Sequence, residues 1–223
     1  MMRILVATDA FPPVCGGSGW STYELARGLR ERGHEVCIVQ AHAGPSWERG
    51  RSYDGFRVRA IEQPAPAVPF VRNYFKNERL WARADQALRA IAADAQADIL
   101  HAQHVLTSPA AVAAGAAVGL PVVCTVRDYW PVCYWGTLIH DPASRGLCPA
   151  CSASMMTRCV RPRAGAAWPL ALPFVPYMRR NLERKQRALS RAGAIVAVST
   201  AIARDLRARS GTLAGARIEI IPN

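Results

Sequence analysis

Short apolar runs alternate with amphipathic stretches along most of the chain. Four apolar runs predict buried strands, and a stretch that alternates apolar with charged residues predicts a half-exposed strand. Strands are expected at 4–7, 36–39, 56–61, 98–102, 122–126, 194–199 and 217–221, and helices after residue 19 and at 73–95, 108–117, 179–192 and 200–210. This alternation predicts a doubly wound, mainly parallel α/β sheet, with one domain spanning residues 1–223.

The first strand–helix–strand unit, residues 1–41, carries a glycine-rich loop. After two prolines the chain runs Gly16-Gly17-Ser18-Gly19, and a Ser or Thr is expected to cap the following helix. Glycines let a backbone approach a ligand closely, and a helix N-terminus favours an anion. A nucleotide or sugar-phosphate site is therefore one hypothesis, and a tight connection without a ligand is the other.

Two common nucleotide-binding motifs do not fit this unit. In the dinucleotide fingerprint GxGxxG, the first glycine follows the strand closely and an acidic residue ends the second strand. Here Pro12-Pro13 intervenes, and the second strand ends at Gln40. The chain also contains no GxxxxGK[ST] sequence, which excludes a P-loop nucleotidase at the level of motif.

Polar residues stand where the predicted strands end. They are Asp9, His104, Arg127, Asp128 and Ser199. The carboxyl ends of parallel strands meet at one edge of a sheet, which is where ligands bind in such folds. We therefore expect these residues and the glycine loop to form one site.

Several segments in a fixed order resemble a known family. They include Gly16-Gly17, Arg32-Gly33-His34, the run 98–104, Thr125 to Trp130, and the run 220–223. Together they resemble the N-terminal domain of retaining glycosyltransferases with the GT-B fold, from the fourth sequence family. That group contains glycogen-synthase-like and phosphatidylinositol-mannosyltransferase-like enzymes. The implied fold is the Rossmann-like N-terminal half of a GT-B enzyme.

The resemblance also implies roles for individual residues. Gly16, Gly17 and Ser18 match the loop that approaches the diphosphate of the nucleotide sugar, and His104 matches a histidine near the transferred sugar. Arg127 and Asp128 match a catalytic His-Asp pair, but arginine stays charged and is suited to orienting an anion rather than moving a proton. The acceptor side is expected to include Asp9, Trp130 and Ser199.

The implied reaction transfers a sugar from a nucleotide-sugar donor to a sugar, polysaccharide or lipid-linked acceptor, with retention of configuration. It needs no cofactor for its chemistry. In the resembling enzymes a second, donor-binding domain follows, so we expect this chain to be the acceptor-side half and to be inactive alone. The alternative is a non-catalytic binding or scaffold module with the same fold.

A segment at 130–163 shows neither helix nor strand periodicity and is interpreted as an insertion. It holds Cys133, Cys148, Cys151 and Cys159. Such spacing is compatible with a structural zinc site that would pin a segment lacking its own core, with disulfides, or with unligated thiols.

The chain has a net charge of +12, and only Lys76 and Lys185 among its 28 basic residues are lysines. Without an aromatic–basic platform or a helix-turn-helix pattern, a nucleic-acid partner is not expected. The apolar and then arginine-rich run 168–187 suggests peripheral membrane contact, and a solvated helix beside a buried loop is the alternative. With no secretory signal and no predicted span, we expect a cytoplasmic protein, with the inner membrane face as its peripheral site.

Overall fold

The computed structural model describes residues 1–222 except 44–50, 69–70, 142 and 144–145. Eight strands form one sheet in the order β3-β4-β2-β1-β5-β6-β7-β8. Every neighbouring pair is parallel except β3 and β4. The strands are β1 (Arg3–Thr8), β2 (Glu35–Ala43), β3 (Ser52–Tyr53), β4 (Phe56–Gln63), β5 (Ile99–Ala102), β6 (Val122–Val126), β7 (Ala194–Ala197) and β8 (Ile218–Ile220). The predicted α/β class is confirmed.

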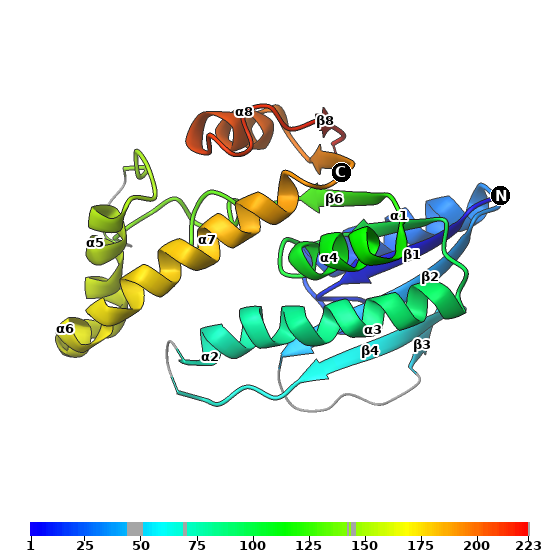
Figure 1. The fold of residues 1–223 in the computed structure, drawn as a ribbon, viewed down its shortest axis with the longest axis horizontal. Helices are drawn as coiled ribbons and strands as arrows, with labels where there is room; N and C mark the ends of the chain where they lie inside the picture. The colour runs from blue at the N-terminus through cyan, green and yellow to red at the C-terminus, as the bar shows by residue number, and fades with distance from the viewer. Residues whose placement is uncertain (44–50, 69–70, 142, 144–145, 223) are drawn as a thin grey trace.

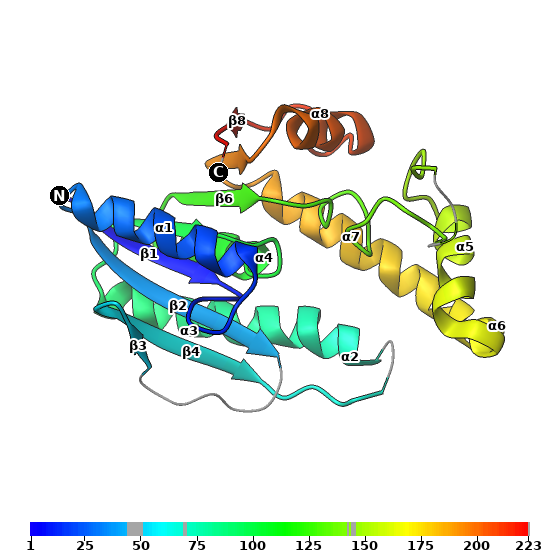
Figure 2. The same ribbon diagram turned by 180° about the vertical axis from the view of Figure 1, so that it is seen from behind.

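Helices connect the strands and cover the sheet (Figure 1, Figure 2). The helical elements are α1 (Gly17–Glu31), α2 (Val71–Tyr74), the π-helical turn η1 (Phe75–Arg79), α3 (Leu80–Asp94), α4 (Ser108–Val118), α5 (Ala153–Ala164), the 3₁₀ turn η2 (Gly165–Ala167), α6 (Trp168–Ala171), the 3₁₀ turn η3 (Leu172–Phe174), α7 (Val175–Leu189) and α8 (Thr200–Arg209). Elements α2, η1 and α3 follow one another directly, which agrees with the single long helix predicted at 73–95.

The two faces of β1 explain why both sides of the sheet are covered. Successive side chains of a strand point to opposite faces. Leu5 and Ala7 pack in the same apolar cluster as residues of α3 and α4, whereas Ile4 and Val6 join a second cluster with Ala26 of α1. Figure 1 shows α3 and α4 on one face, and Figure 2 shows α1 on the other.

The strand order reverses direction at β1. β2 pairs with one side of β1 and β5 with the other, both in parallel. The connections leaving β1 and β5 therefore diverge to opposite faces and open a crevice at their carboxyl ends, which is the topological switch point of such folds. Asp9 follows β1 and His104 follows β5, so both residues stand at this switch point.

A short hairpin was not predicted. β3 and β4 pair in antiparallel fashion through the turn Asp54-Gly55, in which both residues have positive φ, 46° and 75°. Two positive φ values in a two-residue turn are typical of a type I′ hairpin, for which Asp-Gly is a favoured sequence.

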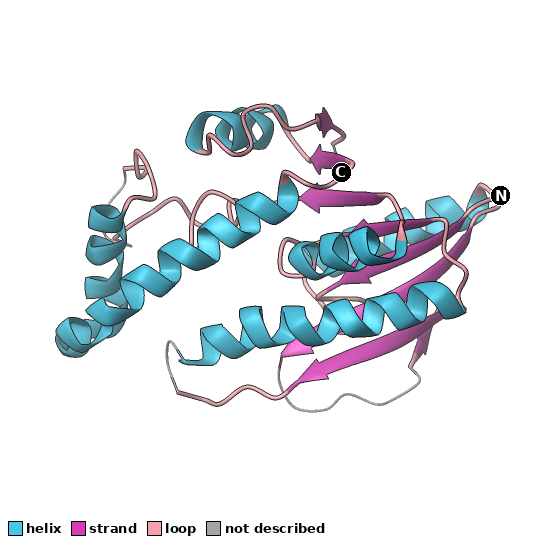
Figure 3. Ribbon diagram, in the orientation of Figure 1, coloured by secondary structure: helices cyan, strands magenta, loops and turns pink. Residues whose placement is uncertain are grey.

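The prediction that 130–163 lacks helical periodicity is wrong, because α5 covers residues 153–164 (Figure 3). The Ser152 side chain caps this helix by accepting a hydrogen bond from the Met155 amide. Met156, Cys159 and Val160 are its buried residues, at the three- and four-residue spacing of a helix face. The segment also has an apolar core, which Met156 and Val160 share with Met178 and Leu182 of α7.

The proline-broken stretch before α7 is also helical. Pro169, Pro173 and Pro176 lie in the first turns of α6, η3 and α7, respectively, where a missing amide hydrogen costs little stability. Ala171, Val175 and Met178 are buried here. Part of the apolar half of the predicted membrane segment is therefore packed internally, while Leu170 is 79% exposed, and peripheral membrane contact stays a prediction. No helix in the described part of the chain is both long and apolar enough to cross a bilayer.

Candidate active site

His104 lies between two carboxylates at the switch point. Its Nδ1 is 3.5 Å from Oδ2 of Asp9, and its Nε2 is 3.4 Å from Oδ2 of Asp128. The side chain of His104 is 11% exposed, while those of Asp9 and Asp128 are 27% and 33% exposed. The imidazole is therefore largely shielded, and the two carboxylates remain open to a ligand. The predicted convergence of these three residues on one edge is confirmed.

A backbone contact fixes the protonation pattern of the neutral imidazole. The amide of Leu106 donates a hydrogen bond of 3.2 Å to Nδ1 of His104. Because Nδ1 accepts this bond, the ring proton of neutral His104 resides on Nε2, facing Asp128. The two carboxylates are consequently not equivalent, since only Asp128 faces the imidazole N–H.

Asp128 is itself held by a local turn. Its Oδ1 accepts a hydrogen bond of 2.9 Å from the amide of Trp130. This contact over two residues is an Asx-turn, which sets the side-chain direction without help from distant elements. Oδ2 is thereby left to face His104.

Arg127 is held by hydrogen bonds to Gln103 and Ser21. One Nη bonds to the carbonyl oxygen of Gln103, and the other donates to Gln103 Oε1 at 2.5 Å and to Ser21 Oγ at 3.1 Å. Burial lowers the pKa of Arg127, and the charges of Asp9 and Asp128 oppose that shift. The guanidinium ties α1 to the ends of β5 and β6, so it positions elements around the site.

The glycine-rich loop is shorter than predicted, because Gly17 and Ser18 already belong to the first turn of α1. Gly16 is the N-cap residue, so the expected Ser or Thr cap is wrong and no side chain caps this helix. A Cβ at Gly16 or Gly17 would meet nothing within 4 Å, whereas one at Gly19 would lie 2.5 Å from Sγ of Cys15. Gly19 is thus required for packing, and the space beside Gly16 and Gly17 is open.

A pocket of about 410 Å³ opens next to Arg127 on the α1 side of the sheet. Its lining is Ser21, Glu24, Leu25, His101, Gln103, Thr125, Arg127, Val196, Val198, Ile221 and Pro222. Burial and the charge of Arg127 lower the pKa of His101 to about 4, so that ring is neutral at pH 7. His101 Nε2 lies 2.8 Å from Thr125 Oγ1 and 2.7 Å from Gln103 Nε2.

Ser199 and Trp130 both have structural contacts. The Ser199 hydroxyl caps α8 by accepting a hydrogen bond of 3.2 Å from the amide of Ile202. Trp130 is partly buried against the main core, and its ring lies 4.6 Å from Nζ of Lys185. Their proposed contact with an acceptor stays a prediction.

Lys185 is a buried cation beside the site that sequence reasoning missed. Its side chain is 0% exposed, and its Nζ has no hydrogen-bond partner among the described residues. The amine faces the rings of Trp130 and Tyr134 at 4.6 and 5.6 Å, a cation–π arrangement. Burial lowers its pKa to about 7, opposed by the charges of Asp128, Glu78, Cys133 and Cys151.

The four cysteines of the insertion lie near one another as pairs. The Cys151 thiol donates a hydrogen bond to Cys133, and the Cys159 thiol donates one to Cys148. A hydrogen bond from Cys151, together with the backbone amides of Leu138, Trp135 and Thr137, lowers the pKa of Cys133, and burial opposes that shift.

All seven cysteines of the chain are free thiols. Among the described residues, no group of three or more His, Cys, Asp or Glu side chains is arranged to hold a metal ion. The zinc prediction gains no support from this arrangement, and metal analysis of the purified protein is its test.

Ser21 and Gln103 were also missed, because both are ordinary polar residues in the sequence and their roles come from contacts with Arg127. Lys185 carried one signal, since it is one of only two lysines in an arginine-rich chain. A compact amine can lose its proton when buried, whereas a guanidinium cannot.

Comparison with known proteins places this geometry in a family. The model of Glycosyltransferase Family 4 matches residues 15–223. No curated protein sequence matches the chain. Among solved structures, sucrose-phosphate synthase from Thermosynechococcus elongatus has a TM-score of 0.54 at 12% identity, covering 99% of this chain and 88% of that one.

Two further structures match over a smaller share of their own length. The lipopolysaccharide outer core galactosyltransferase WaaB in its apo form has a TM-score of 0.52 at 11% identity, covering 100% of this chain and 46% of that one. Apo UGT2 of Phytolacca americana has a TM-score of 0.51 at 12% identity, with coverage of 100% and 52%. The chain thus spans about half the length of these two proteins, and the likeness shows a GT-B half-domain fold. Since the family model covers most of its length, the chain belongs to Glycosyltransferase Family 4.

Proposed function

We propose that this chain is the acceptor-side half of an enzyme that transfers a sugar from a nucleotide-sugar donor to a sugar, polysaccharide or lipid-linked acceptor. The observation that carries the proposal is His104 held between Asp9 and Asp128 at the switch point of a family 4 domain. Ligands of α/β sheets bind in the crevice at that position. The proposed location is the cytoplasm.

The donor diphosphate is proposed to sit at the N-terminus of α1, against Gly16, Gly17 and Ser18. The open space beside the two glycines and the absence of an acidic residue in the first turn favour an anion there. A structure of Phytolacca americana UGT2, with a TM-score of 0.51 at 11% identity, is complexed with UDP-2fluoro-glucose and pterostilbene. That protein binds UDP-2fluoro-glucose together with pterostilbene, which supports a nucleotide-sugar partner here.

The proposed chemistry is a front-face displacement that retains the anomeric configuration. The acceptor oxygen bonds to the anomeric carbon as the bond to the diphosphate breaks, and the hydroxyl proton passes to the departing diphosphate. Asp128 and His104 orient the acceptor hydroxyl, and Asp9, Trp130 and Ser199 complete its side of the site. Positioning and stabilisation of the leaving charge supply the rate, without a cofactor or metal.

The donor site is proposed to be completed by a second domain, as the family resemblance implies, so the chain alone should not turn over. The test compares this chain with the same chain joined to its second domain. Both are incubated with a panel of nucleotide sugars and with glycan or lipid acceptors, and release of nucleoside diphosphate is measured. The anomeric configuration of the product is assigned by NMR.

We expect acceptor-dependent release only from the two-domain protein, and a product with the donor's anomeric configuration. Turnover by the chain alone would refute the half-site proposal, and an inverted product would refute retention. Acceptor binding without turnover in the two-domain protein would instead identify a binding or scaffold module.

A further inference from the structure

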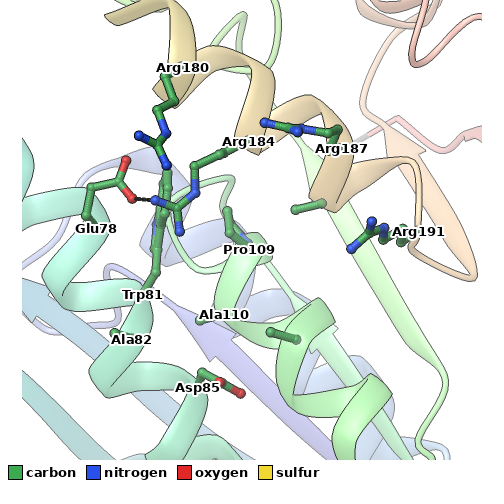
Figure 4. Close-up of a pocket in the computed structure, with 12 residues that line it drawn as sticks. Glu78, Trp81, Ala82, Asp85, Pro109, Ala110, Arg180, Arg184, Arg187 and Arg191 are labelled. Carbon is green, nitrogen blue, oxygen red and sulfur yellow. Dashed lines mark hydrogen bonds and ion pairs between the residues drawn. The ribbon is translucent and has the colours of Figure 1, made fainter. Parts of the chain in front are cut away.

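Four arginines form a row along α7 and the turn that follows it. Arg180, Arg184 and Arg187 follow one another at intervals of four and three residues, which places them on one face of α7, and Arg191 lies in the turn after the helix. All four are exposed. In Figure 4 three of them project from α7 and Arg191 from the segment after it, beside α3 and α4, where they border a groove of about 640 Å³.

The carboxylates of this groove are already paired. Glu78 forms an ion pair with Arg184 and accepts a hydrogen bond of 3.2 Å from Asn181. Asp85 is engaged by Arg89 at 2.6 Å.

Among the described residues, Arg180, Arg187 and Arg191 have no ion pair with a carboxylate. The groove therefore keeps three uncompensated positive charges on one face.

An apolar groove of about 360 Å³ continues from the basic one. The two share Pro109, Ala113, Ala188 and Arg191 as lining residues. Beyond them, the second groove is lined by Val112, Ala116, Leu120 and other small or apolar residues. A ligand matching both parts needs an anionic group at one end and an apolar body at the other.

We propose that this double groove binds a phosphate-bearing lipid. Its phosphate would lie among Arg180, Arg187 and Arg191, and the first part of its hydrocarbon chain would lie against Ala113 and Ala116. Arginine guanidiniums are well suited to phosphate, because their planar donors match its oxygens in pairs. Small side chains on α4 leave room for the chain, whose burial adds hydrophobic stabilisation.

The groove lies close to the candidate active site. Pro109 in the first turn of α4 lines both parts, and it follows His104 by five residues. The apolar part extends toward the amino ends of β6 and β7, where Leu120, Val122 and Gly193 line it. This inference goes beyond sugar transfer and does not depend on it, because lipid binding is measured without any donor or acceptor.

The test is cosedimentation of the full chain with vesicles of phosphatidylcholine alone or with 30% phosphatidylglycerol, a composition of about one anionic lipid in three. We expect binding only to the anionic vesicles. The triple variant R180Q/R187Q/R191Q should bind about a hundredfold more weakly, about fivefold per arginine. The matched control R57Q/R204Q/R217Q removes three exposed charges elsewhere and should retain binding to within a few-fold.

A second variant separates a lipid from a free phosphate. A113F fills the shared part of the two grooves and leaves every charge in place. It should weaken vesicle binding by about tenfold, the equivalent of about 50 Å² of lost apolar contact, without changing the binding of inorganic phosphate.

Four results would overturn the proposal. They are vesicle binding by the triple variant equal to that of the wild type, an equal loss in the control variant, phosphate binding without vesicle binding, and displacement of vesicles by duplex DNA through the same arginines.

Discussion

Charged side chains are arranged differently at the carboxyl edge of the sheet and in the basic groove beside α7. At the edge, His104 stands between two carboxylates and Arg127 is bonded to Gln103 and Ser21. In the groove, three arginines have no carboxylate partner among the described residues. An edge whose side chains hold one another in place is prepared to orient a reacting group, whereas the groove has room for an anion from outside.

Helix α7 separates the two regions, and its opposite faces carry different cations. Lys185 faces inward to Trp130, fully buried, while the arginine row faces outward. Burying a guanidinium would leave a permanent charge without water, whereas an amine can release its proton. The contrast between these faces indicates that burial determines where α7 carries a lysine and where it carries an arginine.

The largest effect in this comparison is expected from a substitution at the carboxyl edge. Replacing Asp128 by Asn removes the charge that faces the imidazole N–H, so we expect kcat of the two-domain enzyme to fall by about 100-fold or more. Asp9→Asn is the matched variant. Because Asp9 faces Nδ1, which already accepts the Leu106 amide, its loss should cost less than about tenfold. Equal effects would show that the two carboxylates act alike and would contradict the assigned tautomer.

The inner face of α7 is tested by changing its buried cation. Lys185→Arg adds volume and a permanent charge to a packed site, so the free energy of unfolding should fall by about 3 kcal/mol. Lys185→Met keeps an apolar chain of similar size and should stay within about 1 kcal/mol of the wild type. Urea unfolding measures both. If arginine were tolerated as well as methionine, the site would be more hydrated than its burial indicates.

The pH dependence of the free energy of unfolding tests whether the buried Lys185 amine titrates near pH 7. Lys185 has a pKa of about 7 in the folded chain against 10.5 for the free side chain. Between these values the unfolded state binds the extra proton, so the free energy of unfolding should rise with pH by up to about 1.4 kcal/mol per unit. The difference between wild type and Lys185→Met, measured from pH 7 to 9, isolates this contribution. A difference that stays constant over that range would mean that the buried amine does not titrate there.

The smallest expected effect concerns the outer face. Removing unpaired, exposed arginines in R180Q/R187Q/R191Q should change the free energy of unfolding by about 0.5 kcal/mol or less. Arg184→Gln should cost more, about 1 kcal/mol, because Glu78 is only 10% exposed and would lose its cation. A large destabilisation by the triple variant would show that its arginines have internal partners after all.

The residues at the carboxyl edge could be predicted from the sequence, because the parallel topology brings the ends of the strands together. In a parallel sheet, residues that directly follow strands share one edge, so Asp9, His104 and Asp128 could be grouped without coordinates. The glycine loop was located for the same reason. Its detail was wrong because the number of residues in the first turn of α1 depends on backbone geometry that glycine leaves open.

The groove and the buried lysine could not be predicted because tertiary packing creates them. Trp81, Pro109 and Arg187 come from three helices far apart in sequence. Lys185 meets Trp130 across 55 positions, and although its rarity as a lysine sets it apart from its arginine neighbours, the sequence does not show which residues bury it. Helix α5 was missed because its buried face combines Met156, Cys159 and Val160, so that the cysteine spacing concealed a helical period.

The most direct test of the central claim, the proposal that sugar transfer takes place at His104, is the turnover of His104→Ala in the proposed two-domain enzyme. The matched control is His34→Ala, since His34 is half-buried before β2, outside the candidate site, and its Nδ1 accepts a hydrogen bond from the amide of Met2. We expect His104→Ala to lose about 100-fold to 10,000-fold in kcat with an unchanged thermal transition, and His34→Ala to match the wild type. Wild-type turnover by a folded His104→Ala variant would contradict the account.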